Sequence, residues 1–174
     1  MRTLTSRAVA TVALLVAVPF LLTSCQQGPT VQPNEAKKDI VDVVDRTTEA
    51  LGGEWTVRRG PALGKCPATA ETDGVTWTYI LDRDEVSDQT ADRAAVKDLW
   101  DSSGITTSDY ESGGADPLRS VIGHGGPTWS IEFLIRSDGY TVHGVSQCAD
   151  GDYKEMLRRG EDDLRSARRA AAVR

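Results

Sequence analysis

Cysteine is the residue type with the most distinctive chemistry in this sequence. The chain has 3 cysteines among 174 residues, Cys25, Cys66 and Cys148. A thiolate can bind a metal ion, form a disulfide or act as a nucleophile. No Cys-x-x-Cys occurs, and the 2 histidines, His124 and His143, lack the spacing of metal ligands. A disulfide between Cys66 and Cys148 requires export to an oxidising compartment; two free thiols or a metal pair are the alternatives.

The N-terminus has the features of an export signal. Arg2 and Arg7 precede an uncharged apolar run over residues 8–22. A run of about 15 residues is too short for a membrane-spanning helix and is typical of the hydrophobic region of a secretory signal. The run ends in Leu22-Thr23-Ser24-Cys25 and not in an A-x-A cleavage site.

Leu22-Thr23-Ser24-Cys25 resembles the lipobox of bacterial lipoproteins, in which an aliphatic residue and two small residues precede a cysteine. The resemblance implies that residues 1–24 are a signal peptide and that Cys25 becomes the acylated N-terminus, with fatty acids such as palmitate. The mature protein is then expected on the outer face of the cell membrane, held there by the lipid on Cys25. Export also favours the disulfide between Cys66 and Cys148 over free thiols.

Two glycine-containing segments raise the alternative of a small serine hydrolase of the cell envelope. Gly123-His124-Gly125-Gly126 resembles the His-Gly-Gly loop of lipases and esterases, and Gly144-Val145-Ser146-Gln147 resembles the start of a nucleophile elbow, with His143 beside it. Cys148 stands where the elbow's closing glycine is required. A chain of this length without alternating strands and helices also lacks the hydrolase sheet. We therefore expect no enzyme and keep the hydrolase, with Ser146 and His124 or His143, as the alternative.

The net charge of the chain limits the classes of partner that it is expected to bind. Without residues 1–24, 18 basic and 26 acidic side chains remain, a net charge of −8. This acidic balance argues against a nucleic-acid partner and against broad adhesion to anionic lipid. Phosphate loops, H-E-x-x-H motifs and calcium loops are absent from the sequence, so we expect no cofactor or metal. The acidic segment 82–85 is predicted to be a solvated turn.

The apolar pattern predicts an α+β domain over residues 34–150, after a flexible tether over residues 25–33. A helix is predicted from Asn34, as N-cap, to residue 51, and a second helix from Ser87 or Asp88 to before Gly104. The second helix is expected to bury Ala91, Ala95, Val96, Leu99 and Trp100. Strands are predicted near residues 54–58, 75–81, 105–110, 118–122, 129–135 and 140–147, with a loop over 60–73 and an edge strand at 118–122. Strands grouped in runs predict an antiparallel sheet with helices on one face, and the element order suggests two helix–strand–strand halves.

The last two strands form the best-defined local unit. Asp138-Gly139 predicts a type I′ hairpin turn, which places Ile135 opposite Val142 and Trp129 opposite Cys148. Strand alternation then puts five residues together on the outward face, which is the predicted binding face: Ser130, Glu132, His143, Val145 and Gln147. An ordinary solvated sheet face is the alternative reading of these residues.

Residues 151–174 are predicted to be a C-terminal helix or a frayed basic tail. Arg165, Arg168, Arg169 and Arg174 have no acidic residue among them. Cations are favourable near a helix C-terminus, and a patch for an anionic ligand or headgroup is the alternative.

As a whole, the chain resembles the small, uncharacterised Lpp-type lipoproteins of actinobacteria. The resemblance covers the lipobox, the tether, a body with two cysteines, and Gly-Gly-Pro-x-Trp at residues 125–129. It implies an envelope lipoprotein, and we expect a non-catalytic module that binds another envelope protein or a small apolar or glycan ligand.

Overall fold

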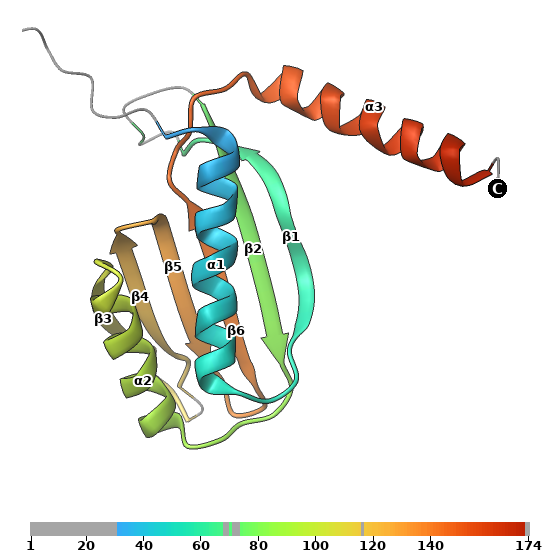
Figure 1. Ribbon diagram of the computed structural model, residues 1–174. Helices are drawn as coiled ribbons and strands as arrows, with labels where there is room; N and C mark the ends of the chain where they lie inside the picture. Colours follow the sequence, from blue (N-terminus) through green and yellow to red (C-terminus); the bar gives the residue numbers. More distant parts are fainter. Residues whose placement is uncertain (1–30, 68–69, 71–73, 116, 173–174) are drawn as a thin grey trace, which may run out of the picture.

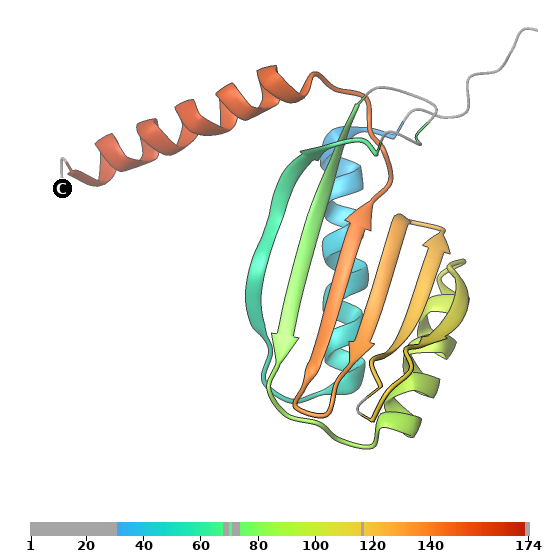
Figure 2. The ribbon, with the colours of Figure 1, turned by 180° about the vertical axis from the view of Figure 1, so that it is seen from behind.

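The computed structural model describes residues 31–67, 70, 74–115 and 117–172. Its elements run in the order α1 (Pro33–Leu51), β1 (Thr56–Lys65), β2 (Val75–Arg83), α2 (Gln89–Ser102), β3 (Thr106–Glu111), β4 (Arg119–Gly125), β5 (Thr128–Ile135), β6 (Tyr140–Ser146) and α3 (Tyr153–Ala172). The six strands form one antiparallel sheet in the order β1-β2-β6-β5-β4-β3. α1 and α2 cover one face of the sheet (Figure 1), and none of the described helices covers the opposite face (Figure 2). The predicted α+β class, with helices on one face, is confirmed.

The two units that each begin with a helix are unequal. β1 and β2 form a hairpin after α1, whereas α2 is followed by the four-stranded meander β3-β4-β5-β6. β6 returns to pair with β2 and joins the units into one sheet. β4 lies between β5 and β3, so the prediction of an edge strand at 118–122 is wrong.

α1 follows the predicted pattern. Its buried residues are Ala36, Ile40, Val43, Val44, Thr47, Thr48 and Leu51, which lie at the spacing of one helix face. The helix begins two residues earlier than an N-cap at Asn34 predicts, because Pro33 takes the first helical position, where its fixed φ suits a helix start and its missing N–H breaks no helical hydrogen bond. Gln32, not Asn34, is the N-cap residue, and Gly52 ends the helix with a φ of 63°.

β1 is longer than the sequence predicts. It continues through Gly60 and Pro61 to Lys65, so the predicted loop over 60–73 begins too early. The pairing with β2 is irregular between Val57 and Arg59 and again between Arg59 and Ala62, and each irregularity adds one residue to β1. β1 is an edge strand, and an edge position tolerates a proline because one side of the strand has no ladder partner.

α2 buries a different set of side chains from the predicted one. Asp88 is the N-cap, and its carboxylate accepts hydrogen bonds from the N–H groups of Thr90 and Ala91 at 3.0 and 3.1 Å. Val96 and Trp100 are buried as predicted, but Ala91 and Ala95 are exposed. The indole N–H of Trp100 donates to the Thr47 hydroxyl at 2.9 Å and joins α2 to α1.

The β5–β6 hairpin has a different register from the predicted one. The N–H of Arg136 donates to the carbonyl of Gly139 at 3.0 Å, and Ile135 pairs with Tyr140, so Ser137-Asp138 forms the centre of the turn. None of the described non-glycine residues has a positive φ, which excludes the predicted type I′ turn at Asp138-Gly139. Tyr140 gains an edge-to-face contact with Phe133 at a centroid distance of 5.1 Å, and this packing outweighs the local turn preference.

The shift amounts to two residues, and side chains alternate with a period of two. The face of every residue in this hairpin is therefore as predicted, although its partner is not. At the far end, Trp129 lies between the pairs Thr128–Ser146 and Ser130–Val145, in an irregularity of the ladder. Trp129 therefore does not face Cys148.

Cys66 and Cys148 form a disulfide with a Cα–Cα distance of 5.5 Å. Cys66 follows β1 and Cys148 follows β6, so the bond crosses the start of β2, which lies between these strands. The bond closes a sequence separation of 82 residues. In the chain-entropy account, a disulfide that closes a loop of this length adds about 4 kcal/mol to the free energy of unfolding.

Candidate functional site

The outward side chains of the sheet, on the face that neither α1 nor α2 covers, form what we call the open face. Antiparallel pairing aligns one residue from each strand in a row across this face. The row consists of Arg59, Ile80, His143, Glu132, Ile122 and Ser108. It places the ionisable pair His143–Glu132 between two isoleucines, and all four side chains are half-buried.

Four of the five predicted binding-face residues are neighbours in this arrangement. His143 pairs directly with Glu132, and Val145 pairs directly with Ser130. Gln147 lies beyond the end of β6, and its amide donates to the carbonyls of Gly126 and Thr128 at 3.1 and 2.7 Å. Gln147 therefore braces the β4–β5 connection and does not complete the face.

Other strands contribute residues to the open face that the sequence did not assign to it. Ile80 and Ile122 flank the His143–Glu132 pair, and Leu134 and Thr141 form part of the next row. That row also contains Ser120, which is buried and whose hydroxyl has no hydrogen-bond partner among the described residues. The alternating pattern of each strand indicated its outward residues, but only the sheet order shows which strands lie side by side.

The environment of His143 favours the neutral imidazole. Burial lowers the pKa of His143 below its usual value, and the positive charges of Arg58 and Arg59 act in the same direction. The carboxylate of Glu132 opposes them. The centre of the open face is therefore an uncharged ring beside a carboxylate, with arginines at the β1 edge.

The residues of the hydrolase alternative do not meet. Ser146 is fully buried, and its hydroxyl accepts from the N–H of Trp77 at 3.0 Å and donates to the carbonyl of Gln147 at 2.8 Å. His143 belongs to the open face, opposite to the face of Ser146, because the two residues are three apart on one strand. His124 is exposed, and its Nδ1 lies 3.1 Å from the carbonyl of Trp129. These positions give no serine–histidine pair, so the geometry does not support a nucleophilic site here.

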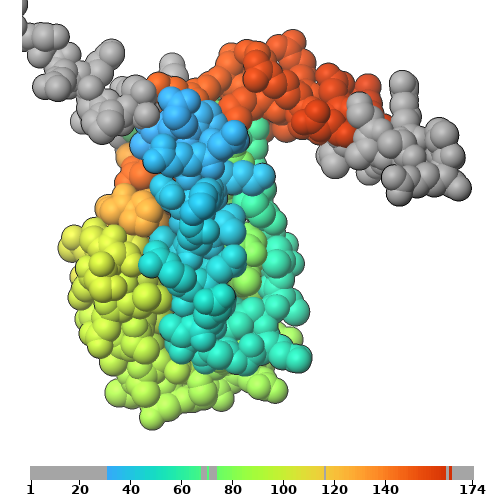
Figure 3. All heavy atoms as spheres, viewed as in Figure 1, coloured from blue at the N-terminus to red at the C-terminus, as the bar shows by residue number. Residues whose placement is uncertain are grey.

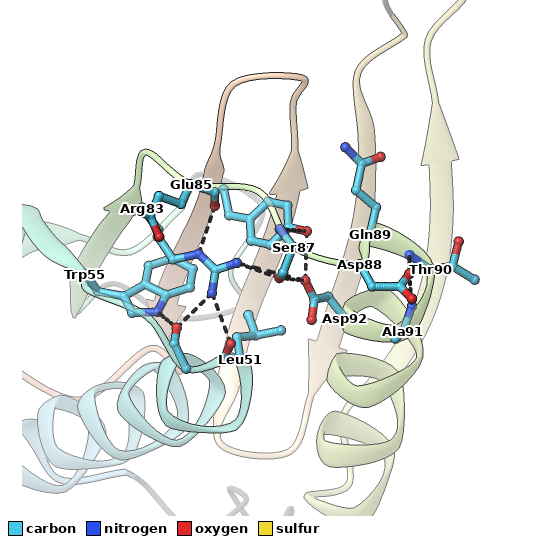
Figure 4. Close-up of polar contacts among 12 residues, drawn as sticks. Leu51, Trp55, Arg83, Glu85, Ser87, Asp88, Gln89, Thr90, Ala91 and Asp92 are labelled. Atoms are coloured by element: carbon cyan, nitrogen blue, oxygen red, sulfur yellow. Dashed lines mark hydrogen bonds and ion pairs between the residues drawn. The ribbon is translucent and has the colours of Figure 1, made fainter.

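A buried arginine at the other end of β2 was also missed. Arg83 was predicted to lie in a solvated turn, but its side chain is only 5 % exposed and lies on the covered face (Figure 4). Nη1 donates to the carbonyls of Leu51 and Gly52 at 3.0 and 2.8 Å, at the C-terminus of α1. Nε donates to the carbonyl of Glu85 and Nη2 to the hydroxyl of Ser87, at 2.9 and 2.8 Å.

Aromatic and acidic side chains complete this cluster. The guanidinium carbon of Arg83 lies 4.6 Å from the ring centroid of Tyr140 and 5.5 Å from that of Trp55. The Tyr140 hydroxyl donates to Asp92 at 2.7 Å, and burial followed by the Asp92 carboxylate raises the pKa of Tyr140. The Arg83 donors are almost all used by the protein, so the cluster joins α1, α2 and the sheet and has little capacity for a ligand.

An open acidic groove runs along the exposed side of α1. It has a volume of about 560 Å³, and its lining includes Asp39, Asp42, Asp45, Glu49 and Pro127. Burial raises the pKa of Asp45, while a hydrogen bond from Tyr79 lowers it. Among the described residues, no group of three histidine, cysteine or acidic side chains is arranged to hold a metal ion.

Cys25 and the other lipobox residues lie outside the described residues. The helices that the structure describes are all too short or too polar to cross a bilayer.

Comparison with known proteins gives one similar structure. No family model matches the chain, and no curated protein matches it in sequence. A crystal structure of a DUF4853 family protein from Actinomyces odontolyticus ATCC 17982 superposes with a TM-score of 0.46 and 18% identity, over 72% of each chain.

Proposed function

We propose that this protein is a lipid-anchored module of the cell envelope that binds a partner without catalysis, through the open face of its sheet. The lipobox at residues 22–25 supports the anchor and a location on the outer side of the cell membrane. The partner is another envelope protein or a glycan, and nucleic acid is disfavoured by the acidic chain.

The observation that carries the proposal is the composition of the central row of the open face. One face of an antiparallel sheet is commonly solvated, and such a face needs only polar side chains. Here Ile80 and Ile122 flank the His143–Glu132 pair, and Val145 lies one row away. Apolar side chains around a polar pair resemble the composition of a contact surface, in which apolar area provides affinity and polar groups provide orientation.

Because the anchor confines the protein to the membrane, a low-affinity contact is sufficient for binding a partner there. A domain confined to the membrane meets its neighbours at an effective concentration far above its bulk value, in the millimolar range for short flexible linkers. A shallow sheet surface can therefore function without a deep pocket.

Photo-crosslinking in intact cells tests this proposal. A crosslinking amino acid in place of Glu132, on the open face, should give a reproducible adduct. The control places the crosslinking amino acid at Asp98, an exposed acidic residue of α2 on the other side of the molecule. We expect no such adduct at Asp98, and we expect Val145→Asp to abolish the adduct at position 132.

Equal labelling at positions 132 and 98, or labelling of lipid alone, would refute a specific contact through the open face. Mass analysis of the same protein reports the anchor separately, since acylation of Cys25 adds a defined mass to the N-terminal peptide. An unmodified Cys25 in the membrane fraction would refute the anchor while leaving the contact surface to be judged by the crosslinks.

A further inference from the structure

We infer that α3 lies on an anionic membrane surface, beside the lipid anchor. This inference rests on the proposed anchoring at Cys25. It adds a second contact between the protein and the membrane and names the helix that makes it.

The first observation is that α3 is a long helix with almost no support from the body of the protein. It extends away from the sheet and the other helices (Figures 1, 2 and 3). Tyr153 and Met156, in its first turn, pack against the core, whereas Leu157 is 43% exposed. Helices in proteins owe most of their stability to an apolar face packed on other elements, and Gly160 further weakens α3. A surface that covers this face would supply the missing stabilisation.

The second observation is that the N-terminal end of α3, which we call its base, is fixed next to Val31, the first described residue. The N–H of Asp150 donates to the carbonyl of Val31 at 3.2 Å. Ala149 forms bridges with Val31 and Val75, and the disulfide at Cys148 holds the preceding residue. The chain therefore enters the domain and leaves it for α3 at the same point.

The length of chain before Val31 determines how far this point can be from the membrane. Six residue steps separate Cys25 from Val31, and an extended chain spans at most about 3.6 Å per residue, or roughly 20 Å in total. α3 has 20 residues and is therefore about 30 Å long. An acylated Cys25 thus keeps the base of α3 close enough to the bilayer for the helix to reach the headgroups.

The third observation is the distribution of charge. Residues 25–152 contain 11 basic and 22 acidic side chains, whereas residues 153–174 contain 7 basic and 4 acidic ones. The body is repelled by an anionic surface, and the C-terminal segment is attracted to it. Each cation near such a surface adds about 1 kcal/mol of attraction. An amphipathic helix with cations beside an apolar face binds at a membrane interface in this way.

The test uses the whole acylated protein added to preformed vesicles, so that it occupies their outer leaflet. One set consists of phosphatidylcholine alone and the other of phosphatidylcholine with phosphatidylglycerol. Trypsin cleavage after Arg158 and Arg159, which are exposed in the structure, reports the accessibility of α3. We expect cleavage to be about tenfold slower on the anionic vesicles, and high salt to remove the difference.

Two variants separate the helix face from a general effect of hydrophobicity. Leu157→Glu should restore fast cleavage on anionic vesicles. The matched control is Val57→Glu, which changes another exposed apolar residue, in β1, and should leave the protection intact.

Flotation with the vesicles reports the anchor independently of α3. Protein that lacks the acyl group and does not float overturns the anchor, and this inference with it. Protein that floats but is cleaved equally fast on both kinds of vesicle overturns the inference alone. Protection that persists on phosphatidylcholine vesicles and increases with protein density identifies a second copy of the chain as the occupant, and also overturns it.

Discussion

The two faces of the sheet are built from the same strands and are under different constraints. Along β6, Tyr140, Val142 and Gly144 lie on the face under α1 and are fully buried or without space for a larger side chain. His143 and Val145 alternate with them on the open face and are half-buried. Residues on the covered face are determined by packing, whereas those on the open face contact mainly their cross-strand neighbours. The part of the open face around His143 and Val145 is thus the one on which residues can change for function at small cost in stability, whereas Ser120 and Thr141 of the next row are buried.

Two arginines show the same contrast. Arg83 of β2 lies on the covered face, 5 % exposed, with each of its nitrogens hydrogen-bonded. Arg59 of β1 pairs with Ile80 on the open face and is exposed. The same residue type is part of the structural framework in one place and a surface cation in the other.

The largest effect that we predict is that of Arg83→Ala. The substitution leaves the carbonyl of Leu51 without its side-chain donor and the carboxylate of Asp92 without a nearby cation, while the carbonyl of Gly52 keeps only the indole N–H of Trp55. Removal of one partner from a buried ionic cluster costs about 3–5 kcal/mol. Chemical denaturation of the purified domain should show a decrease of this size in the free energy of unfolding.

Arg59→Ala is the matched control, because the same side chain is removed from the open face. Exposed substitutions of this kind change stability by about 0.5 kcal/mol or less. If the two variants lost equal stability, the proposed difference between the faces would be wrong.

The second prediction concerns how much room each face of the sheet has for a larger side chain. A Cβ atom on Gly144 would lie 2.6 Å from Cδ1 of Ile40 and 2.9 Å from Cγ2 of Val44. Gly144→Val should therefore cost up to about 3 kcal/mol through overpacking under α1. Ser130→Val adds bulk to the open face, where it pairs with Val145, and should change the free energy of unfolding by about 0.5 kcal/mol or less. A stable Gly144→Val variant would show that α1 can move away from the sheet.

The sequence predicts which face of a helix or strand each side chain occupies better than it predicts which residues pair between strands. Burial of α1 follows from its three- and four-residue spacing, and strand alternation assigns Ser130, Glu132, His143 and Val145 to one face. These features depend on local periodicity alone. The disulfide was also predicted, because the resemblance to a lipobox implies export and acylation of Cys25, and the two cysteines that then remain have one possible intramolecular bridge.

Features that depend on distant contacts could not be predicted. Asp138-Gly139 has the strongest local turn preference, but the packing of Tyr140 on Phe133 and Asp92 selects another register. Pro61 predicts a loop unless β1 is known to be an edge strand. Arg83 lies among acidic residues in the sequence, and only the fold shows that the C-terminus of α1 accepts its donors.

The smallest predicted effect is a pH dependence that arises from the open face itself. Burial lowers the pKa of His143 from its usual 6.5, so the folded protein binds a proton at this ring less tightly than the unfolded chain does. As the pH falls below 6.5, the unfolded state takes up the proton first, and stability is lost until the folded-state pKa is passed. NMR titration of the His143 ring should give a pKa below 6.5, and Glu132→Gln should lower it further, because Glu132 is a negative charge that raises it. The free energy of unfolding should decrease between pH 7 and the folded-state pKa, and His143→Gln should remove that decrease, whereas His124→Gln should leave it in place. A ring that titrates above 6.5 would mean that Glu132 dominates over burial, and that the open face has a charged centre.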